Sequence, residues 1–498
     1  MVDLFEDRKS KLDKLRRDGV DPFPYRFDRT ITASEGVSRF EKGDLEDSPQ
    51  RLAGRIMSIR GHGKSSFSHI LDMSGRIQVY FKQDVVGDAA YETVKLLDIG
   101  DLIGVEGTFF RTRTGEVTVK VKEITLLAKS LRTLPIVKEE KKEDGEVVQY
   151  DSFSDKEQRY RQRYVDLIVN PEVRQKFLTR SKVIDHLRRF LREKDFIEVE
   201  TPILQPIYGG ATARPFTTFH NVLDMQLYLR IADELYLKRL MVGGFEKVFE
   251  FCKDFRNEGI DKLHNPEFTM VELYQAYADY TDMMSLVEEM FSSLLMSLFD
   301  RTILEYQGRE LTFTPPWAKI GFLDAIEKYA SVRLDSWDEK KLRKICEKNK
   351  VDVEEVSGIS KLFDKLFSEV VEPRLIDPTF VVDYPAETTP LAKRKKEQPH
   401  LVERFELFIS GMEIANAFSE LTDPLEQRLR FEEQLSVGTD EGEGGSEDRI
   451  DEDYLRAMEY GMPPTGGMGI GIDRLVMLMT DSPSIKEIIL FPHLRPEV

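Results

Sequence analysis

Three segments of the 498-residue chain combine arginines, carboxylates and glycines in patterns that suit the binding of phosphates and cations. In the first, residues 248–274, the hydrophobic pattern predicts a strand, a long polar loop and a second strand. Arg256 stands where the first strand ends. An arginine held on rigid backbone can bind a phosphate through two parallel hydrogen bonds, which a lysine cannot do. The alternative is a surface hairpin whose arginine makes an ordinary ion pair.

The second segment, residues 466–479, is rich in glycine and then turns into an apolar run that predicts a helix. Glycines let another group approach the backbone closely. Arg474 falls near the start of the predicted helix, where the positive end of the helix dipole favours an anion. The spacing does not fit a dinucleotide fingerprint, and the alternative is close helix packing through the glycines.

The third segment, residues 405–421, places carboxylates on strands that are otherwise apolar. Glu406 and Glu413 flank a predicted turn at Ser410 and Gly411, and Glu420 follows seven residues after Glu413. A buried carboxylate is costly unless a cation compensates it. Mg²⁺ on nucleotide phosphates and the ammonium group of a substrate are two such cations.

The charge of the chain is unevenly distributed. The whole chain has 72 Lys and Arg against 90 Asp and Glu, a formal charge of −18, which argues against a polyanionic partner. Residues 51–130 differ, because they carry 12 basic and 9 acidic side chains. They also contain about five short runs of alternating hydrophobicity, which predict a small β-barrel of the oligonucleotide-binding type. A nucleic-acid-binding barrel is therefore compatible with an acidic protein.

The order of the predicted elements divides the chain into residues 1–150 and 151–498. Helical spacing predicts a helix that ends at Gly19, ahead of the barrel. The charged, glycine-containing segment 138–151 is predicted to be a linker.

Helices and longer strands are predicted beyond the linker. Asn170 and Pro171 suit the start of a helix that continues to residue 193, and an alternating strand follows at 196–202. Residues 280–375 are predicted to be mainly helical, and residues 380–385 to form a buried strand.

Several other classes of site and protein are excluded or disfavoured. Cys252 and Cys346 are far apart and no CxxC motif is present, which argues against a disulfide framework or a zinc cluster and fits a reducing compartment. The seven histidines form no HExxH motif.

No signal sequence and no apolar run of about 18 residues is found, so a soluble cytoplasmic protein is expected. The residues 63–65 resemble the end of a P-loop, but the earlier glycine and the helix are missing. Residues 437–453 carry eight acidic side chains and one arginine and are expected to be a solvated loop without a binding role.

Together these segments resemble the class II aminoacyl-tRNA synthetases. FIEVETP (196–202), FRNEG…HNPEFTMVELY (255–274) and GMGIGIDRL (467–475) are similar to the three motifs of that family, in order and in spacing. YGGATARPF (208–216), IADELYLKRL (231–240) and GMEIANAFSEL (411–421) narrow the resemblance to its lysyl-tRNA synthetases of the bacterial and eukaryotic type. The resemblance implies an α+β fold, in which an N-terminal OB-fold β-barrel for the anticodon (1–150) precedes a catalytic domain (151–498). That domain would contain a mixed, mainly antiparallel sheet flanked by helices.

The resemblance also implies a reaction. L-Lysine and ATP would form lysyl-adenylate and pyrophosphate, and the lysyl group would then pass to the 3′ end of tRNA(Lys). Arg256 would bridge the lysine carboxylate and the α-phosphate, and Arg474 would hold the γ-phosphate and pack against adenine opposite Phe268. These two arginines are the expected catalytic residues. Glu406 and Glu413 would hold Mg²⁺. The expected ATP-binding residues are Arg256, Glu258, His264, Asn265, Phe268, Glu406 and Arg474.

The expected lysine-binding residues are Gly210, Glu234, Glu272, Tyr274, Asn416, Phe418 and Glu420. Among them, Glu234 and Gly210 would bind the α-amino group, and Glu420 would bind the ε-ammonium. A carboxylate at the end of the pocket suits a cationic side chain and repels aspartate. In the barrel, Phe67, Gln78 and Glu116 match residues that read a uridine-rich anticodon.

A homodimer is implied as well, with the helix 171–193 and the following strand at its interface. The alternative is that the apolar face of this helix packs within its own chain. Three other functions stay open: an aspartyl or asparaginyl enzyme, a paralogue that attaches lysine to a protein, and a non-catalytic nucleic-acid-binding protein. Such a paralogue should lack the barrel, and a non-catalytic protein would not need the arginines and glutamates.

Overall fold

The computed structural model describes residues 3–45, 48–135, 138–141, 147–150, 153–211, 213–334, 338–354, 356, 358–437 and 450–497. The chain divides into two compact units, Met1–Asn170 and Pro171–Val498. Most of the acidic segment 437–453, which we expected to be a solvated loop, lies outside the described residues.

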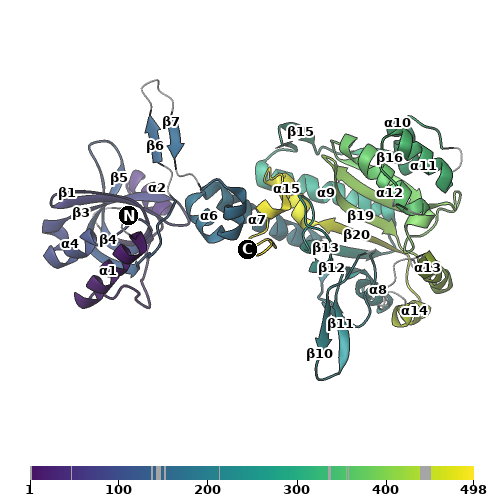
Figure 1. Cartoon of the computed structure of the whole chain (residues 1–498), viewed down its shortest axis with the longest axis horizontal. Coiled ribbons are helices and arrows are strands. Elements are labelled where there is room, and N and C mark those ends of the chain that lie inside the picture. The colour runs from purple at the N-terminus through teal and green to yellow at the C-terminus, as the bar shows by residue number, and fades with distance from the viewer. Residues whose placement is uncertain are drawn as a thin grey trace. The chain divides into compact units, whose positions relative to one another are not determined.

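A closed five-stranded barrel forms the centre of the first unit, as predicted, with the strand order β1-β2-β3-β5-β4 (Figure 1). The pair β3 and β5 is parallel and the other neighbours are antiparallel. Segment 138–151, where a linker was expected, contains the short strands β6 and β7, which pair in antiparallel fashion. The elements of this unit are α1 (Leu4–Arg17), α2 (Ala33–Glu41), β1 (Gln50–His62), β2 (Ser65–Leu71), β3 (Arg76–Lys82), α3 (Gln83–Val86), α4 (Asp88–Lys95), β4 (Leu102–Arg111), β5 (Val117–Ala128), β6 (Lys138–Lys141), β7 (Val147–Tyr150), α5 (Lys156–Arg161) and α6 (Arg163–Val169).

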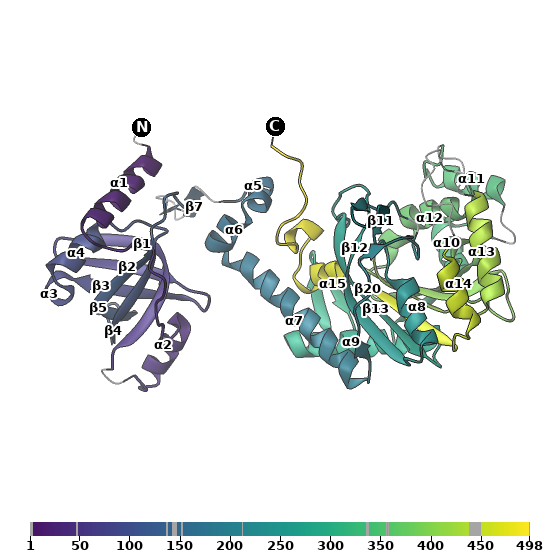
Figure 2. The ribbon, with the colours of Figure 1, turned by 90° about the horizontal axis from the view of Figure 1, so that it is seen from below.

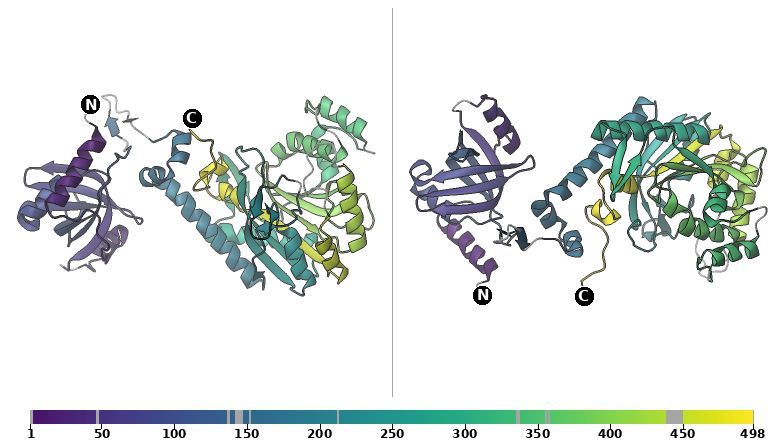
Figure 3. Two further views of the ribbon diagram at one scale, coloured as in Figure 1. Left: turned by 60° about the horizontal axis from the view of Figure 1, so that its bottom comes forward. Right: turned by 90° about the horizontal axis from the view of Figure 1, so that it is seen from above.

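Apolar and polar residues alternate along the strands, so that the apolar side chains fill the interior of the barrel. The apolar residues of β3, Ile77, Val79 and Phe81, are buried in the core of this unit, and the polar residues between them face outward as predicted. Helix α1 lies beside the barrel (Figure 3), and its Leu15 belongs to the same core. The guanidinium of Arg8 in α1 donates hydrogen bonds to backbone carbonyls that follow β5 and precede β4.

An eight-stranded sheet forms the centre of the second unit, with the order β16-β17-β18-β19-β20-β13-β12-β8. Its outermost pair at each end is parallel and the pairs between them are antiparallel, so the expected mixed, mainly antiparallel sheet is confirmed. The helices of this unit are α7 (Pro171–Glu193), α8 (Glu234–Val242), α9 (Tyr280–Phe299), α10 (Phe322–Ala330), α11 (Glu339–Lys348), α12 (Ile359–Val370), α13 (Pro424–Val437), α14 (Glu452–Glu459) and α15 (Ile472–Met479), with 3₁₀ turns η1 (Glu372–Arg374), η2 (Ala386–Thr388) and η4 (Ile485–Glu487). The strands are β8 (Ile197–Glu198), β9 (Leu204–Gln205), β10 (Thr217–His220), β11 (Met225–Leu229), β12 (Lys247–Phe255), β13 (Glu267–Ala276), β14 (Ile303–Tyr306), β15 (Arg309–Thr312), β16 (Ala318–Gly321), β17 (Thr379–Pro385), β18 (Leu401–Ile409), β19 (Met412–Ser419) and β20 (Thr465–Gly471).

Helices α7, α9 and α15 cover one face of this sheet (Figure 2). Their apolar side chains share a core with Phe249, Leu273, Ala417 and Ile470 of the strands. Because neighbouring residues of a strand point to opposite faces, the residues between these apolar positions lie on the other face. Over that face, α8 packs against β12 and β13, and α10 and α12 pack near β17. The area between them is left for polar side chains.

Two predicted elements differ from the observed ones. The predicted strand at 196–202 is reduced to β8, which is the last strand of the sheet and therefore an edge. Residues 280–375 contain not only helices but also β14, β15 and β16. Gln307 and Gly308, both at positive φ, turn the chain into the hairpin of β14 and β15, and β16 pairs with β17 in the large sheet.

Helix α7 spans Pro171–Glu193, as predicted. Its apolar face is buried within its own chain, since Val183, Leu187 and Leu191 are inaccessible in the core shared with α9. Burial of this face is the alternative that we set against a dimer contact.

Among the described residues, no helix combines the length and the apolar character needed to cross a membrane.

Candidate functional site

The three segments with arginines, carboxylates and glycines lie on adjacent strands. The first segment forms β12 and β13, the second forms β20 and α15, and the third forms β18 and β19. The strand register places Glu406, Asn416, Gly469, Glu272 and Glu250 side by side across five neighbouring strands. The sheet thus brings together residues up to about half the chain apart, on the face that α7, α9 and α15 leave uncovered.

Glycines of the central strand β20 make room for this row of side chains. A Cβ atom added to Gly467 would lie 2.5 Å from Cε1 of Tyr274 and would also collide with the carboxylate of Glu420. A Cβ atom added to Gly469 would collide with the carboxylate of Glu272. Three of the expected lysine-binding side chains, Tyr274, Glu420 and Glu272, therefore occupy space that a side chain at Gly467 or Gly469 would fill.

Two buried carboxylates, Glu234 and Glu420, both pair with the ammonium group of Lys238. Burial raises the pKa of Glu420 to about 8 and outweighs Lys238, which acts in the opposite direction. The neighbouring carboxylates Glu234 and Glu420 raise the pKa of Lys238 despite its burial, so it stays charged. The sequence analysis did not single out Lys238. It lies four residues after Glu234 in α8, a spacing that brings two side chains together on one face of a helix.

The remaining expected lysine-binding residues lie near Glu234, Glu420 and Lys238. Gly210 has a positive φ, and its Cβ position is 3.6 Å from Oε2 of Glu234, so the backbone approaches that carboxylate closely. The ring of Phe418 lies under Nζ of Lys238, 5.3 Å from it. Asn416 accepts a hydrogen bond of 3.1 Å from Nε of Arg404. Burial and the carboxylates of Asp233 and Glu234 raise the pKa of Glu272.

Arg474 connects the second and third segments with the loop of the first. Its guanidinium donates a hydrogen bond of 2.8 Å to the backbone carbonyl of Glu413 and lies 3.0 Å from Nε2 of His264. The other ring nitrogen of His264 is 2.8 Å from a carboxylate oxygen of Asp261. The contacts confirm that residues about 200 positions apart meet here.

Arg256 follows β12 and lies over the ring of Phe268, with 5.0 Å between the guanidinium carbon and the ring centre. Its buried Nε has no hydrogen-bond partner among the described residues, and neither does Oδ1 of Asn265. Glu258 is exposed in the loop after Arg256. Unpartnered buried polar atoms are unusual in folded proteins, and they suit a ligand that completes their hydrogen bonds.

Glu406 is one of the two expected metal ligands. Tyr384 donates a hydrogen bond of 2.7 Å to one carboxylate oxygen, and Arg404 donates to the other. Burial raises the pKa of Glu406 to about 7, against the effect of Arg404, and the nearby Glu413 raises it further.

A third carboxylate, which sequence reasoning missed, lies in the same region. Burial, followed by the charges of Glu406 and Glu413, raises the pKa of Glu372 to about 7. Carboxylates that hold protons near neutral pH are under-compensated by cations, so the donor set fits a hard divalent ion such as Mg²⁺.

The three expected anticodon-reading residues cluster on the outer surface of the barrel. Phe67 is 37% exposed and stacks on Tyr80, with 4.5 Å between the ring centres. Gln78 donates a hydrogen bond of 2.7 Å to Glu116, whose other oxygen is 2.8 Å from Nε2 of His69. Phe67 lies outside the barrel core, where an aromatic ring can stack on a base. Tyr80 and His69 were not among the expected residues.

Comparisons with known proteins agree with this arrangement. Residues 155–495 match the model of the tRNA synthetases class II (D, K and N), and residues 50–127 match the OB-fold nucleic acid binding domain. The chain is 52% identical to the lysine–tRNA ligase of Carboxydothermus hydrogenoformans over 99% of this chain and 98% of that protein. It is 53% identical to that of Pelotomaculum thermopropionicum (99% and 95%) and 50% identical to that of Moorella thermoacetica (99% and 98%).

Proposed function

Since this chain belongs to the class II tRNA synthetases of the D, K and N group, we propose that it is a lysine–tRNA ligase. It activates L-lysine with ATP and transfers the lysyl group to the 3′ end of tRNA(Lys). In this assignment residues 1–150 read the anticodon and residues 151–498 carry out catalysis. Two free buried cysteines agree with a reducing compartment, and we place the enzyme in the cytoplasm.

The charge of the pocket is the observation that carries this proposal. Glu234, Glu272 and Glu420 are three carboxyl groups around the one ammonium of Lys238, which leaves a formal charge of −2 when all three are ionised. The raised pKa values of Glu272 and Glu420 reflect this lack of cations, which the ammonium groups of a substrate would supply. L-Lysine brings two ammonium groups, one at its α-carbon and one at the end of its side chain. Aspartate and asparagine bring only the α-ammonium, and the carboxylate of aspartate would be repelled. The pocket therefore favours lysine over the amino acids of the related enzymes.

The proposed roles within the pocket follow the positions of the side chains. Glu234 and the backbone at Gly210 bind the α-ammonium, and Glu420 with Glu272 and Tyr274 binds the ε-ammonium. Asn416 and Phe418 line the pocket between them. Lys238 holds Glu234 and Glu420 in place before the substrate arrives.

Adenylate formation requires the substrate carboxylate to attack the α-phosphate in line, so positioning and charge stabilisation supply most of the catalysis. Arg256, with a free Nε, binds the carboxylate and the α-phosphate. Arg474 and His264, in contact with each other, bind the terminal phosphates. Phe268, Asn265 and Glu258 bind the adenine.

We assign Mg²⁺ to Glu406 and Glu413, with Glu372 beside them. When bound, Mg²⁺ neutralises charge on the phosphates and the leaving pyrophosphate. The protein residues orient this corner of the site, because Tyr384 and Arg404 fix the carboxylate of Glu406.

We also propose a homodimer in which the edge strand β8 takes part. Ile197 of β8 is 51% exposed, and an exposed edge strand offers unpaired backbone groups to a second copy. Light scattering after size exclusion tests this assignment. The mass of two chains is expected, and the mass of one chain at micromolar concentration would contradict it.

Aminoacylation tests the whole proposal. A tRNA(Lys) transcript should accept radiolabelled lysine from the purified enzyme. A transcript in which the anticodon uridines are replaced should be charged at least about fivefold less efficiently, because a wrong base edge leaves hydrogen-bonding groups of Gln78 or Glu116 unpaired, which costs about 1–3 kcal/mol. Equal charging of both transcripts would contradict the role of the barrel, and no charging of either would contradict the function.

A further inference from the structure

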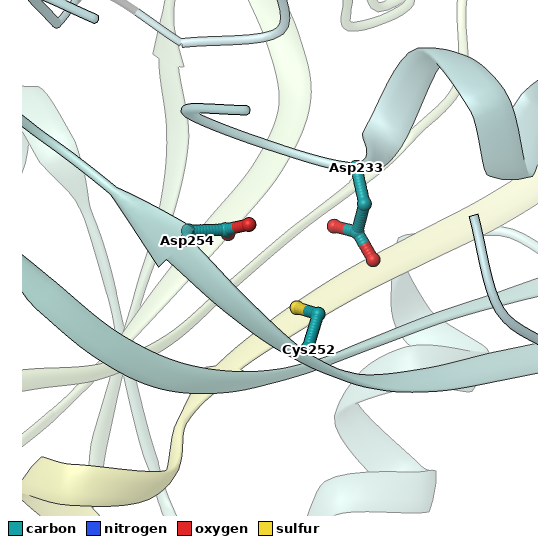
Figure 4. Close-up of side chains that lie close together, drawn as sticks. All are labelled: Asp233, Cys252 and Asp254. Atoms are coloured by element: carbon teal, nitrogen blue, oxygen red, sulfur yellow. The ribbon is translucent and has the colours of Figure 1, made fainter. Parts of the chain in front are cut away.

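A trio of side chains beside the proposed amino-acid pocket has no part in the function described so far. Asp233 immediately precedes α8, and Cys252 and Asp254 lie two residues apart on β12, on the same face of the sheet as Glu250. The three side chains point toward one another (Figure 4), and one donor atom from each lies within 4.8 Å of the other two. All three are almost fully buried, with exposed fractions of 0%, 2% and 1%.

The two carboxylates of the trio lack hydrogen bonds. Neither oxygen of Asp233 and neither oxygen of Asp254 has a hydrogen-bond partner among the described residues. Asp233 occupies the N-cap position of α8 and yet accepts no capping hydrogen bond, so its side chain is directed into the trio instead. Within the described part of the chain, the one hydrogen-bond contact of the Cys252 thiol is a long one of 3.8 Å to the carbonyl of Met270. Buried polar atoms of this kind call for a ligand or a proton.

Nearby cations do not compensate these acids. Arg230 lies 3.3 Å from Asp254, but it also pairs with Glu250 at 2.7 Å and donates to the carbonyl of Lys253. Asp233, Asp254 and Glu250 around the guanidinium of Arg230 leave a formal charge of −2. Ionisation of the Cys252 thiol makes it −3, and one divalent cation would reduce that to −1. Two further charges interact with the trio electrostatically. Glu272 repels the carboxylate of Asp233, whereas Arg256 attracts that of Asp254, so their effects on the trio oppose each other.

Protons are the alternative to a cation. Burial, and for Asp233 also the nearby Asp254, raises the pKa of both carboxyls, that of Asp254 to about 6. Burial likewise raises the pKa of the Cys252 thiol. In the absence of a metal ion the Cys252 thiol therefore keeps its proton at neutral pH, and the raised pKa values of the two carboxyls favour their protonated forms. An ion that binds there must displace the protons that are held.

The donor types indicate which ion would bind. Mg²⁺ and Ca²⁺ prefer oxygen ligands, whereas a thiolate together with two carboxylates suits a borderline transition metal such as zinc. Zinc–ligand distances are about 2.0–2.3 Å, so small rotations of the three side chains would close the trio around an ion. We propose that Asp233, Cys252 and Asp254 bind one divalent transition-metal ion of the zinc class. This ion connects the start of α8, which carries Glu234 and Lys238, to β12.

This site has no recognisable sequence spacing. Cys252 and Cys346 are the only two cysteines of the chain, and the absence of a CxxC motif argued against a zinc cluster. The structure supplies carboxylates in place of further cysteines, from a helix cap and from the same strand.

Cobalt provides a spectroscopic test on the full chain without ATP or added Mg²⁺. The enzyme is produced in cobalt-supplemented medium, so that the ion is present during folding, and is purified without chelators. We expect about one cobalt per chain by elemental analysis and a thiolate-to-cobalt charge-transfer band in the near ultraviolet. The substitution Cys252→Ser should abolish the band and reduce the cobalt content at least tenfold. The matched control is Cys346→Ser, which alters the other buried cysteine, in α11, and should keep both signals.

The variant Asp233→Asn keeps the test decisive if Cys252→Ser fails to fold. The proposal expects Asp233→Asn to lose the cobalt, and it expects zinc to raise the melting temperature of the wild type but not that of this variant. Wild-type enzyme that contains no cobalt would overturn the proposal, and so would cobalt that persists at full occupancy in Cys252→Ser or Asp233→Asn. Either result would mean that the trio is balanced by protons.

Discussion

Gly467 and Tyr274 stand opposite each other on β20 and β13, and a Cβ atom on Gly467 would lie 2.5 Å from the tyrosine ring. The same Cβ atom would collide with Glu420. The glycine-rich strand β20 thus forms one side of the proposed amino-acid pocket. The helix that follows it carries Arg474 to the proposed phosphate site.

Gly467→Ala should therefore impair lysine binding more than folding. The added methyl group displaces Tyr274 and Glu420, and we expect the KM for L-lysine to rise at least about tenfold, which corresponds to about 1.4 kcal/mol. The KM for ATP should change little. In the control Gly471→Ala, the nearest atom to the new Cβ is 3.7 Å away, so both KM values should stay within about threefold. Equal effects of the two substitutions would contradict the claim that Gly467 leaves room for Tyr274 and Glu420 in the proposed pocket.

Glu420→Gln removes a charged partner from the ε-ammonium. Hydrogen bonds to charged groups contribute about 1.5–3 kcal/mol, so the KM for lysine should rise about tenfold to hundredfold. Lys238 keeps Glu234 as a partner, and the variant should remain folded, as a thermal melt can verify. An unchanged lysine affinity would remove Glu420 from the binding site.

Affinity for MgATP should depend on pH through the carboxylates of the proposed Mg²⁺ site, Glu406, Glu413 and Glu372. The pKa of Glu406 and that of Glu372 are both about 7, well above the ordinary value of a glutamate. Below pH 7 these carboxyls are protonated and a cation must displace the proton. Affinity should therefore fall as the pH is lowered from 8 to 6, by up to about tenfold per unit for one displaced proton.

Calorimetry at several pH values, corrected for the titration of ATP itself, measures this dependence. The variant Glu372→Gln should lose part of the slope because one of the two titrating groups is gone. A corrected affinity that is flat between pH 6 and 8 would show that neither carboxyl meets the cation.

Phe67→Ala should separate the two steps of the reaction. Loss of a stacking surface costs about 1–3 kcal/mol, so kcat/KM for tRNA(Lys) should fall about 5-fold to 150-fold. ATP–pyrophosphate exchange, which needs no tRNA, should be normal. Tyr25→Ala, at a fully exposed aromatic residue of the same unit, should affect neither. Equal loss in both assays for Phe67→Ala would point to a misfolded barrel.

Much of the fold could be predicted from local patterns. Alternation specified the strands of the barrel, and Asn170 with Pro171 specified the start of α7. Strand lengths were harder to predict, because pairing partners decide them. The predicted strand at 196–202 retains only two residues, since β8 pairs with β12 at only Ile197 and Glu198.

The candidate site could be predicted as a set of motifs but not as a set of contacts. Arg474 and His264 are far apart in sequence, and only the order of the strands brings them together. Lys238 and Glu372 were missed because a lysine on a helix or a glutamate before a proline is usually a surface residue. Their burial between carboxylates results from tertiary packing, which no local pattern reports.

The dependence of ATP–pyrophosphate exchange on the amino acid tests the central claim most directly. Purified enzyme is assayed without tRNA, with each of L-lysine, L-aspartate and L-asparagine as the only amino acid. Because the proposed pocket offers three carboxyl groups against the one ammonium of Lys238, we predict exchange with L-lysine alone. Exchange with aspartate or asparagine but not with lysine would contradict the assignment, and so would the absence of exchange with all three.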